Sequence, residues 1–355
     1  MQIAAVGRAF PEHYYSQDQL LAAFREHWAP HIFNLARLEQ LHRNVLVGGR
    51  HLALPLEEYP RLRSFADSNN AYIRCATELG AAATLNALAA LDLPPTAVDH
   101  LFFVSVTGIA TPSIDARLVN RLGLRPDLKR TPIFGLGCVA GAAGVARAAD
   151  YLRAFPEQAA LVLSVELCSL TLQPEDFSIP NLIASGLFGD GAAAVLLLGE
   201  RHPRRLQAPG RSPTVLATRS CFYRDTEDAM GWEITDRGFK VVLSDEVPAL
   251  IGRMIRGDVE RFLESQALTL RDLASYVSHP GGPKILRAVE EALELPPDAL
   301  ELSRRHLAAV GNLSSASVLM VLGDTIAERR PAPGRHGLLF SMGPGFCSEL
   351  VLLRW

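Results

Sequence analysis

Residues 131–151, TPIFGLGCVAGAAGVARAADY, decide how the rest of the chain is interpreted. A short apolar run ends in Gly135-Leu136-Gly137, which is typical of a strand that closes in a tight turn. A run of small residues follows Cys138 and predicts a helix. Because glycine inside a helix is destabilising, its presence here indicates close packing, and we expect the helix to be buried.

Cys138 falls at the first turn of this predicted helix. The unpaired N–H groups and the positive end of the helix dipole favour a thiolate at such a place. The alternative is that Cys138 is a small buried hydrophobic residue, as many intracellular cysteines are. The pattern around Cys138 alone leaves both interpretations open.

Composition narrows the class of protein. The chain has 355 residues, 48% of them hydrophobic and 21% charged, which is enough for two domains or one large unit of two similar halves. A net charge of −3 without a basic tract argues against nucleic-acid binding, and the absence of a long apolar run argues against a membrane span. Five scattered cysteines without a C-x-x-C pair predict no disulfides, no metal site and a reducing, cytoplasmic location.

Strand and helix patterns alternate along the chain. Residues 3–6, 100–106 and 160–167 are predicted strands, and residues 70–92 have the composition and spacing of a helix. Such alternation predicts an α/β architecture with a covered sheet. The chain lacks the glycine-rich phosphate-binding fingerprints, so nucleotide chemistry has no support.

Two similar segments, each at the end of one half of the sequence, suggest an internal duplication. LFGDGAAAVLLLGE (187–200) and SMGPGFCSELVLLR (341–354) each pass from a glycine turn into an apolar strand. YVSHPGGPKIL (276–286) likewise resembles the strand, turn and helix start around Cys138. We therefore expect halves at residues 1–200 and 201–355, joined by a Pro- and Arg-rich linker at 199–213.

Two polar residues of the second half lie in settings similar to that of Cys138. His279 ends an apolar strand before Pro280-Gly281-Gly282, and Asn312 precedes a second helix of small residues. Each alone has an ordinary explanation, a structural hydrogen bond for His279 and an N-cap for Asn312. Together, a cysteine, a histidine and an amide would provide a nucleophile, its proton partner and an oxyanion donor.

Five motifs, GLGCVAGAAG, GLFGDGAAA, HPGGPKIL, GNLSSASV and MGPGF, occur in an order that resembles the type III polyketide synthases. These are the chalcone-synthase-like branch of the thiolase-fold condensing enzymes. The resemblance implies two pseudo-duplicated halves forming a five-layered α/β/α/β/α core. It also implies a homodimer that uses acyl-CoA and malonyl-CoA as substrates and needs no cofactor.

The resemblance also assigns roles. Cys138 would take the acyl group from a CoA thioester, and His279 and Asn312 would bind the malonyl thioester carbonyl and stabilise the enolate left by decarboxylation. Phe188 matches an aromatic gatekeeper that disfavours the malonyl carboxylate. Thr111 matches a residue that reaches into the partner subunit's cavity.

Departures from the family pattern bear on the substrate. Val241 replaces a second gatekeeping phenylalanine, and Trp232 falls where chalcone synthases keep a glycine. GWEITDRGFKVVLS is similar to alkylpyrone and alkylresorcinol synthases, which start from fatty acyl-CoA, and we favour this starter. VELCSLTLQP is similar to tetrahydroxynaphthalene synthases, which use malonyl units alone. The residues that align with family pocket positions are Thr107, Cys168, Thr171, Trp232, Val241 and Ser314.

Three alternatives stay open. A ketoacyl synthase of fatty-acid initiation also uses Cys, His and Asn, although HPGGP and GNLSSASV favour the polyketide branch. Cysteine proteases share the order Cys, His, Asn, but the sequence motif that surrounds their catalytic cysteine is absent. A non-catalytic acyl-binding scaffold is the third. Arg43 and Arg50 are our candidates for binding the CoA phosphates.

Overall fold

The fold is built on one mixed sheet. The computed structural model describes residues 1–28, 35–207 and 212–355, and within these ranges nine strands follow the order β11-β12-β13-β8-β1-β7-β6-β4-β5. The strands of the first half are β1 (Gln2–Ala9), β4 (His100–Val104), β5 (Lys129–Ile133), β6 (Ala159–Leu167) and β7 (Asp190–Leu198). Those of the second half are β8 (Thr214–Phe222), β11 (Leu273–Ser278), β12 (His336–Gly343) and β13 (Cys347–Arg354).

The two parts of this sheet repeat one pattern of strand directions. In the first part, β7 lies antiparallel to both β6 and β1, and β4 is parallel to β6. In the second part, β13 lies antiparallel to both β12 and β8, and β11 is parallel to β12. The parts meet where Gln2 of β1 pairs with Thr214 of β8. The repeat confirms the expected pseudo-duplication.

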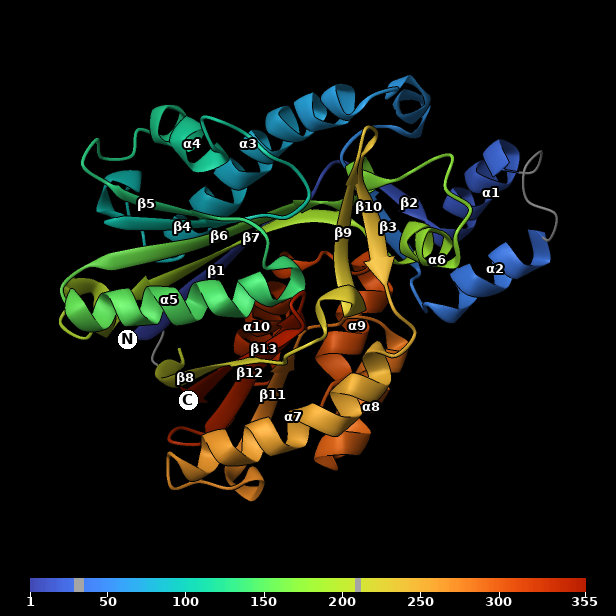
Figure 1. Cartoon of the computed structure of the whole chain (residues 1–355). Helices are drawn as coiled ribbons and strands as arrows, with labels where there is room; N and C mark the ends of the chain where they lie inside the picture. Colours follow the sequence, from blue (N-terminus) through green and yellow to red (C-terminus); the bar gives the residue numbers. More distant parts are fainter. Residues whose placement is uncertain (29–34, 208–211) are drawn as a thin grey trace.

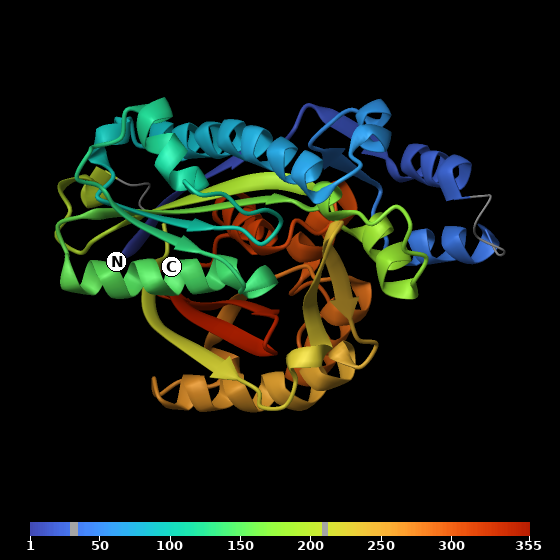
Figure 2. The same cartoon turned by 45° about the horizontal axis from the view of Figure 1, so that its top comes forward.

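Helices separate and cover the two parts of the sheet (Figures 1 and 2). Helices α5 (Ala140–Ala154) and α10 (Ser315–Glu328) lie side by side between them, while α3 (Phe65–Ala89) and α4 (Ile114–Leu122) cover the outer face of the first part. Helices α7 (Val247–Glu264) and α8 (Pro283–Leu293) cover the outer face of the second part. The arrangement confirms the predicted five-layered α/β/α/β/α core.

Small residues make the central layer possible. A Cβ atom built on Gly141 of α5 would lie 2.2 Å from the carbonyl oxygen of Ser315 at the start of α10. A Cβ on Gly144 would lie 2.7 Å from Val162 of β6. The glycines that weaken this helix intrinsically therefore allow it to pack tightly against its neighbours.

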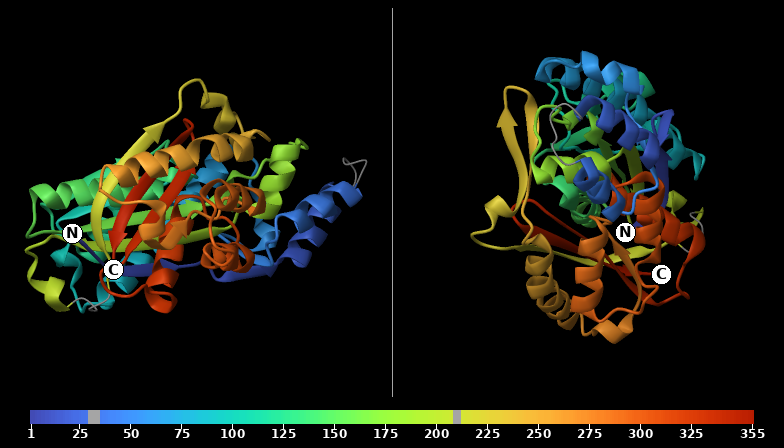
Figure 3. Two further views of the ribbon diagram at one scale, coloured as in Figure 1. Left: turned by 90° about the horizontal axis from the view of Figure 1, so that it is seen from below. Right: turned by 90° about the vertical axis from the view of Figure 1, so that its right-hand side faces the viewer.

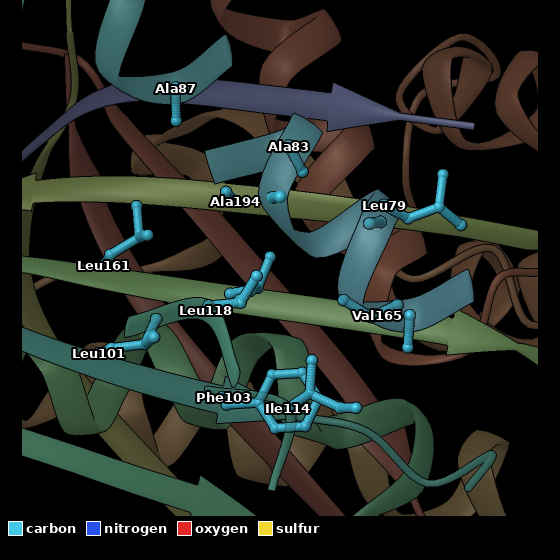
Figure 4. Close-up of a cluster of buried hydrophobic side chains, with 14 of the residues drawn as sticks. Leu79, Ala83, Ala87, Leu101, Phe103, Ile114, Leu118, Leu161, Val165 and Ala194 are labelled. Atoms are coloured by element: carbon cyan, nitrogen blue, oxygen red, sulfur yellow. The ribbon is translucent and has the colours of Figure 1, made fainter. Parts of the chain in front are cut away.

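Apolar side chains fill the space between α3 and the sheet (Figure 4). Leu79, Ala83 and Ala87 follow one another at four-residue spacing on α3, above Val165 of β6 and Ala194 of β7. Strands β6 and β7 are buried along their whole length, as expected of central strands covered on both faces.

Smaller elements surround one end of the sheet (Figure 3). They are the hairpins β2 (His13–Ser16) with β3 (Gly49–Leu52) and β9 (Met230–Thr235) with β10 (Gly238–Leu243), the helices α1 (Gln17–Trp28), α2 (Leu35–Asn44), α6 (Ile179–Leu187) and α9 (Glu301–Val310), and the 3-10 turns η1 (Leu56–Arg61), η3 (Gly137–Val139) and η4 (Cys168–Thr171). The predicted linker includes η5 (Pro203–Gln207), and its residues 208–211 lie outside the described part. No helix in the described ranges is long and apolar enough to cross a bilayer.

Candidate active site

A cavity of about 690 Å³ opens where the two halves meet. Its lining includes Cys138 from the first half and His279 and Asn312 from the second. Phe188 and Ser314 line the same space. The structure therefore brings together the three polar residues that the sequence singled out.

Cys138 lies on the 3-10 turn η3, directly before α5. The preceding Gly137 has φ +54°, and a Cβ there would lie 2.6 Å from the Pro344 ring, so the approach to Cys138 requires glycine. The Cys138 thiol donates a hydrogen bond of 3.6 Å to the hydroxyl of Ser314. Burial raises the pKa of this thiol to about 12, and the Ser314 hydroxyl opposes the rise.

His279 follows the last residue of β11, and its backbone N–H donates to the Phe340 carbonyl of β12 at 3.1 Å. The ring is buried, and neither of its nitrogens has a hydrogen-bond partner among the described residues. Burial lowers the pKa of His279 to about 3, because the imidazolium would lose its hydration. A neutral imidazole with a free ring nitrogen can accept a proton from a neighbouring thiol.

The amide of Asn312 has a fixed orientation. Its Oδ1 accepts a hydrogen bond of 2.8 Å from the backbone N–H of Ser314, and its Nδ2 donates to the Gly281 carbonyl at 3.2 Å. An amide nitrogen carries two donor hydrogens, so one remains for a ligand. The neighbouring Ser314 has φ +47°, a strained conformation for a non-glycine residue and one that recurs at functional sites.

Four residues form a partition between this cavity and a second one of about 610 Å³: Cys168, Phe188, Trp232 and Val241 line both spaces. The Trp232 indole N–H donates to the Val106 carbonyl at 3.0 Å, which ties the β9–β10 hairpin to the residues after β4. Apolar side chains from α1 and the residues that follow η4 line much of the second cavity, among them Leu20, Phe24, Trp28 and Leu172.

One cavity prediction needs correction, and two other predicted residues lie away from the main cavity. Thr107 is buried and does not line either cavity, because its hydroxyl donates to Glu166 at 2.9 Å and accepts from the Leu167 N–H at 2.9 Å. Thr171 lines the second cavity rather than the first. Thr111 lies in a separate surface groove beside β4 and β5.

The predicted phosphate ligands also differ from what the structure offers. Arg50 is only 3% exposed, and its guanidinium donates to the Phe188 carbonyl at 2.7 Å, so it cannot reach a phosphate in solvent. Arg43 is exposed but does not line the main cavity. The basic residues at that cavity are Arg37 and Lys284. Arg37, Leu41 and Asn44 recur at helical spacing, and this spacing was the signal that could have indicated that one face of α2 lines the cavity.

A buried carboxyl group behind the cavity was also missed. Glu166 of β6 is fully buried and accepts hydrogen bonds from the Val106 N–H at 3.1 Å, from Thr107 and from Ser315. Burial raises its pKa to about 7. An acidic residue inside the apolar run ALVLSVEL was the available signal, since buried carboxyl groups need partners.

The comparisons with known proteins identify the class. Family profiles for chalcone and stilbene synthases match the chain, the N-terminal domain over residues 1–200 and the C-terminal domain over 215–355. The chain belongs to this family, and it is a type III polyketide synthase, an enzyme that condenses CoA thioesters.

Individual relatives refine the class. The chain is 48% identical over 353 residues to a 1,3,6,8-tetrahydroxynaphthalene synthase of Streptomyces peucetius subsp. caesius, covering 99% of this chain and 93% of the relative. It is 34% identical to the synthase of that name from Streptomyces coelicolor, covering 97% and 90%. The crystal structure of the tetrahydroxynaphthalene synthase of Streptomyces coelicolor A3(2) superimposes with a TM-score of 0.93 at 32% identity, covering 100% of this chain and 99% of that one.

Proposed function

We propose that this polyketide synthase uses malonyl-CoA both as starter and as extender, and that it forms a tetrahydroxynaphthalene-type product. The observation that carries the proposal is the 48% identity, over nearly the whole chain, to a 1,3,6,8-tetrahydroxynaphthalene synthase. The comparisons favour this alternative over the fatty acyl-CoA starter that we preferred from the sequence. The bulk of Trp232 at the cavity wall agrees with a small starter.

In the proposed reaction, Cys138 attacks the thioester carbonyl of the starter, and its thiol proton passes to His279 while the CoA thiolate leaves. Both ring nitrogens of His279 lack partners among the described residues, so the ring can take this proton. Thiolate and imidazolium then form together, because a dry cavity disfavours either charge alone. The proton finally protonates the departing CoA thiolate.

Decarboxylation then supplies the nucleophile. The malonyl carboxylate leaves as carbon dioxide, and the electron pair of the broken C–C bond moves onto the thioester as an enolate. The free amide hydrogen of Asn312 and the N–H of the His279 ring, which is neutral again once it has protonated CoA, stabilise the enolate oxygen. The enolate carbon attacks the acyl carbonyl on Cys138, which forms the new C–C bond and releases the Cys138 thiolate.

Phe188 would promote this step through its apolar ring. The ring borders the cavity beside Asn312, with which Phe188 forms a parallel backbone bridge. An apolar surface disfavours the charged carboxylate and tolerates neutral carbon dioxide. Val241, which lines the same cavity, would leave a wider passage than a second phenylalanine would.

CoA would enter from the side of α2 and α8. Arg37 and Lys284 are exposed and line the cavity there, so they are our candidates for contacts with the CoA phosphates.

We further propose that the enzyme acts as a homodimer in the cytoplasm. Ile109 and Phe134, 46% and 53% exposed, lie in the groove that contains Thr111, which suits a face covered by a partner, and five unpaired thiols suit a reducing compartment.

A fatty acyl-CoA starter remains the second candidate because of the second cavity. Its apolar lining beyond Trp232 and Val241 could accept an alkyl chain if these side chains moved aside.

The test is to incubate the purified protein with malonyl-CoA alone, and then with acetyl- to stearoyl-CoA in addition, and to identify products by mass. We expect carbon dioxide release and an aromatic product from malonyl-CoA alone. Product formation only after addition of a long acyl-CoA would favour the second candidate. A lack of product under every condition would contradict both.

A further inference from the structure

Arg50 was expected to face CoA, but the structure places it at a junction of the two halves, where it lines the second cavity and not the main one. There the backbone of residues 187–189 runs beside that of residues 311–313. The Asn312 N–H donates to the Leu187 carbonyl at 2.9 Å, and the Gly189 N–H donates to the Asn312 carbonyl at 3.0 Å. The pairing places the Phe188 ring and the Asn312 amide on neighbouring backbone segments of the same cavity.

The stem of Arg50 contacts both segments where each carries a glycine. A Cβ built on Gly189 would lie 3.3 Å from Arg50 Cβ, and one on Gly311 would lie 3.1 Å from Arg50 Cγ and Cδ. Gly311 also has φ +78°, which a side chain would disfavour. The nearest atoms to these two Cβ positions are backbone carbonyls, Val310 at 2.5 Å from Gly189 and Leu187 at 2.7 Å from Gly311. The two glycines thus allow the two backbones to approach each other, and the stem of Arg50 lies against both.

The guanidinium of Arg50 binds the backbone of Phe188. Its Nη1 donates to the Phe188 carbonyl at 2.7 Å, whereas Nε and Nη2 have no hydrogen-bond partner within the described ranges. The carboxylate of Asp190, two residues after Phe188, accepts from the Ala53 N–H at 2.6 Å, so a second contact ties the same segment to the residues after β3. Burying a cation is costly, and burial lowers the pKa of Arg50 to about 10 even though the nearby carboxylate of Asp190 favours the charge. A guanidinium buried at that remaining cost, with its hydrogen bond to the Phe188 carbonyl, calls for an explanation beyond packing.

We propose that Arg50 is a positioning residue for decarboxylation: by holding the Phe188 carbonyl beneath the paired glycine segments, it sets the Phe188 ring against the Asn312 amide. The inference rests on the proposed function, since it assumes that these two side chains act on malonyl-CoA. It assigns no contact between Arg50 and the substrate. Cys138 lies on η3, and its hydrogen bond goes to the Ser314 hydroxyl rather than to Arg50 or to residues 187–189.

The test compares Arg50→Met, Arg50→Lys and the control Arg43→Met, which removes an exposed arginine from the neighbouring helix. Carbon dioxide release from malonyl-CoA gives kcat and KM, and the rate of iodoacetamide alkylation reports on Cys138. For Arg50→Met we expect kcat to fall by about tenfold to a hundredfold, because small displacements of reacting groups cost rate steeply. We expect KM and the alkylation rate to stay within about twofold, and Arg50→Lys, which keeps a donor, to recover part of kcat.

A double-variant cycle separates positioning from general damage. In a Phe188→Ala background, Arg50→Met should lower kcat by less than about threefold, because the group that it orients is already absent. An undiminished effect in that background, a wild-type kcat in Arg50→Met, or parallel loss of kcat and Cys138 alkylation would overturn the inference. Should Arg50→Met fail to fold, Arg50→Lys is measured in the same cycle. Wild-type protein that releases no carbon dioxide would instead contradict the proposed function.

Discussion

The helices α5 and α10 occupy equivalent places in the two halves, yet the residues before their first turns differ in chemistry. Cys138 precedes α5 on the 3-10 turn η3, directly after Gly137. Asn312 precedes α10, and Ser314 between them is held at φ +47°. The close approach of Gly141 to Ser315 brings the two helix starts together. A duplicated scaffold can thus direct a nucleophile and an oxyanion donor at one space.

The largest expected effect concerns the α5 side. Cys138→Ala should abolish condensation, while carbon dioxide release from malonyl-CoA stays within about tenfold of wild type, because the enolate-stabilising pair belongs to the other half. The two reactions are followed separately by product mass and by radiolabelled carbon dioxide. Cys221→Ala, a half-buried cysteine on β8, is the control. Equal loss of both reactions would contradict the assignment of acyl transfer to the α5 side and of decarboxylation to the α10 side.

The complementary change is on the α10 side. Asn312→Ala should lower carbon dioxide release by about 10²–10³-fold, the usual cost of an oxyanion donor. Alkylation of Cys138 by iodoacetamide should change little, since Asn312 does not contact the thiol directly. Asn120→Ala on α4 is the exposed control. Unchanged carbon dioxide release would remove Asn312 from the reaction.

A smaller effect is expected at the partition between the main cavity and the second one. Trp232→Gly should join the two cavities and shift products toward longer chains or accept longer acyl-CoA starters, with total turnover changed by less than about tenfold. Ile234→Ala, 67% exposed on the same hairpin, should leave the products unchanged. An identical product profile in Trp232→Gly would show that the partition does not limit the length of the polyketide product.

The smallest effect concerns the carboxyl group that accepts a hydrogen bond from Ser315 at the start of α10. Burial raises the pKa of Glu166 from 4.5 to about 7, so the folded protein binds the proton more tightly than the unfolded chain does. The contribution of Glu166 to stability should therefore fall as pH rises from about 4.5 to about 7, by up to about 3 kcal/mol. The buried His279 and His306, whose pKa values burial lowers to about 3, contribute in the opposite direction.

Urea unfolding at several pH values checks this prediction. Glu166→Gln should make the change in stability between pH 4.5 and 7 more positive than in the wild type, because the amide does not titrate, whereas the exposed Glu264→Gln should leave that change as it is. An identical change in Glu166→Gln and wild type would show that Glu166 does not contribute to the pH dependence.

Local sequence predicted much of the fold for a clear physical reason. Apolar runs ending at glycine turns, followed by small residues, predicted strands, close turns and buried helices, and Gly137, Gly141 and Gly144 each lie where a side chain would collide. The same pattern indicated Cys138, His279 and Asn312 as one group.

Features that depend on distant partners could not be predicted from local sequence. The hydroxyl of Thr107 turns to Glu166, which is on another strand, and Arg50 turns inward to a carbonyl far along the chain. The second cavity is assembled from α1, η1 and the residues around η4, so no single stretch indicates it. Side-chain direction is decided by such tertiary contacts rather than by residue type.

The central claim is that the sulfur before α5 carries the growing chain opposite the amide before α10. The most direct measurement is peptide mapping by mass spectrometry after brief incubation of the purified protein with malonyl-CoA. The account predicts an acyl adduct on Cys138 and on none of the other four cysteines. An adduct on Cys168 with Cys138 unmodified, or turnover without any adduct on Cys138, would contradict it.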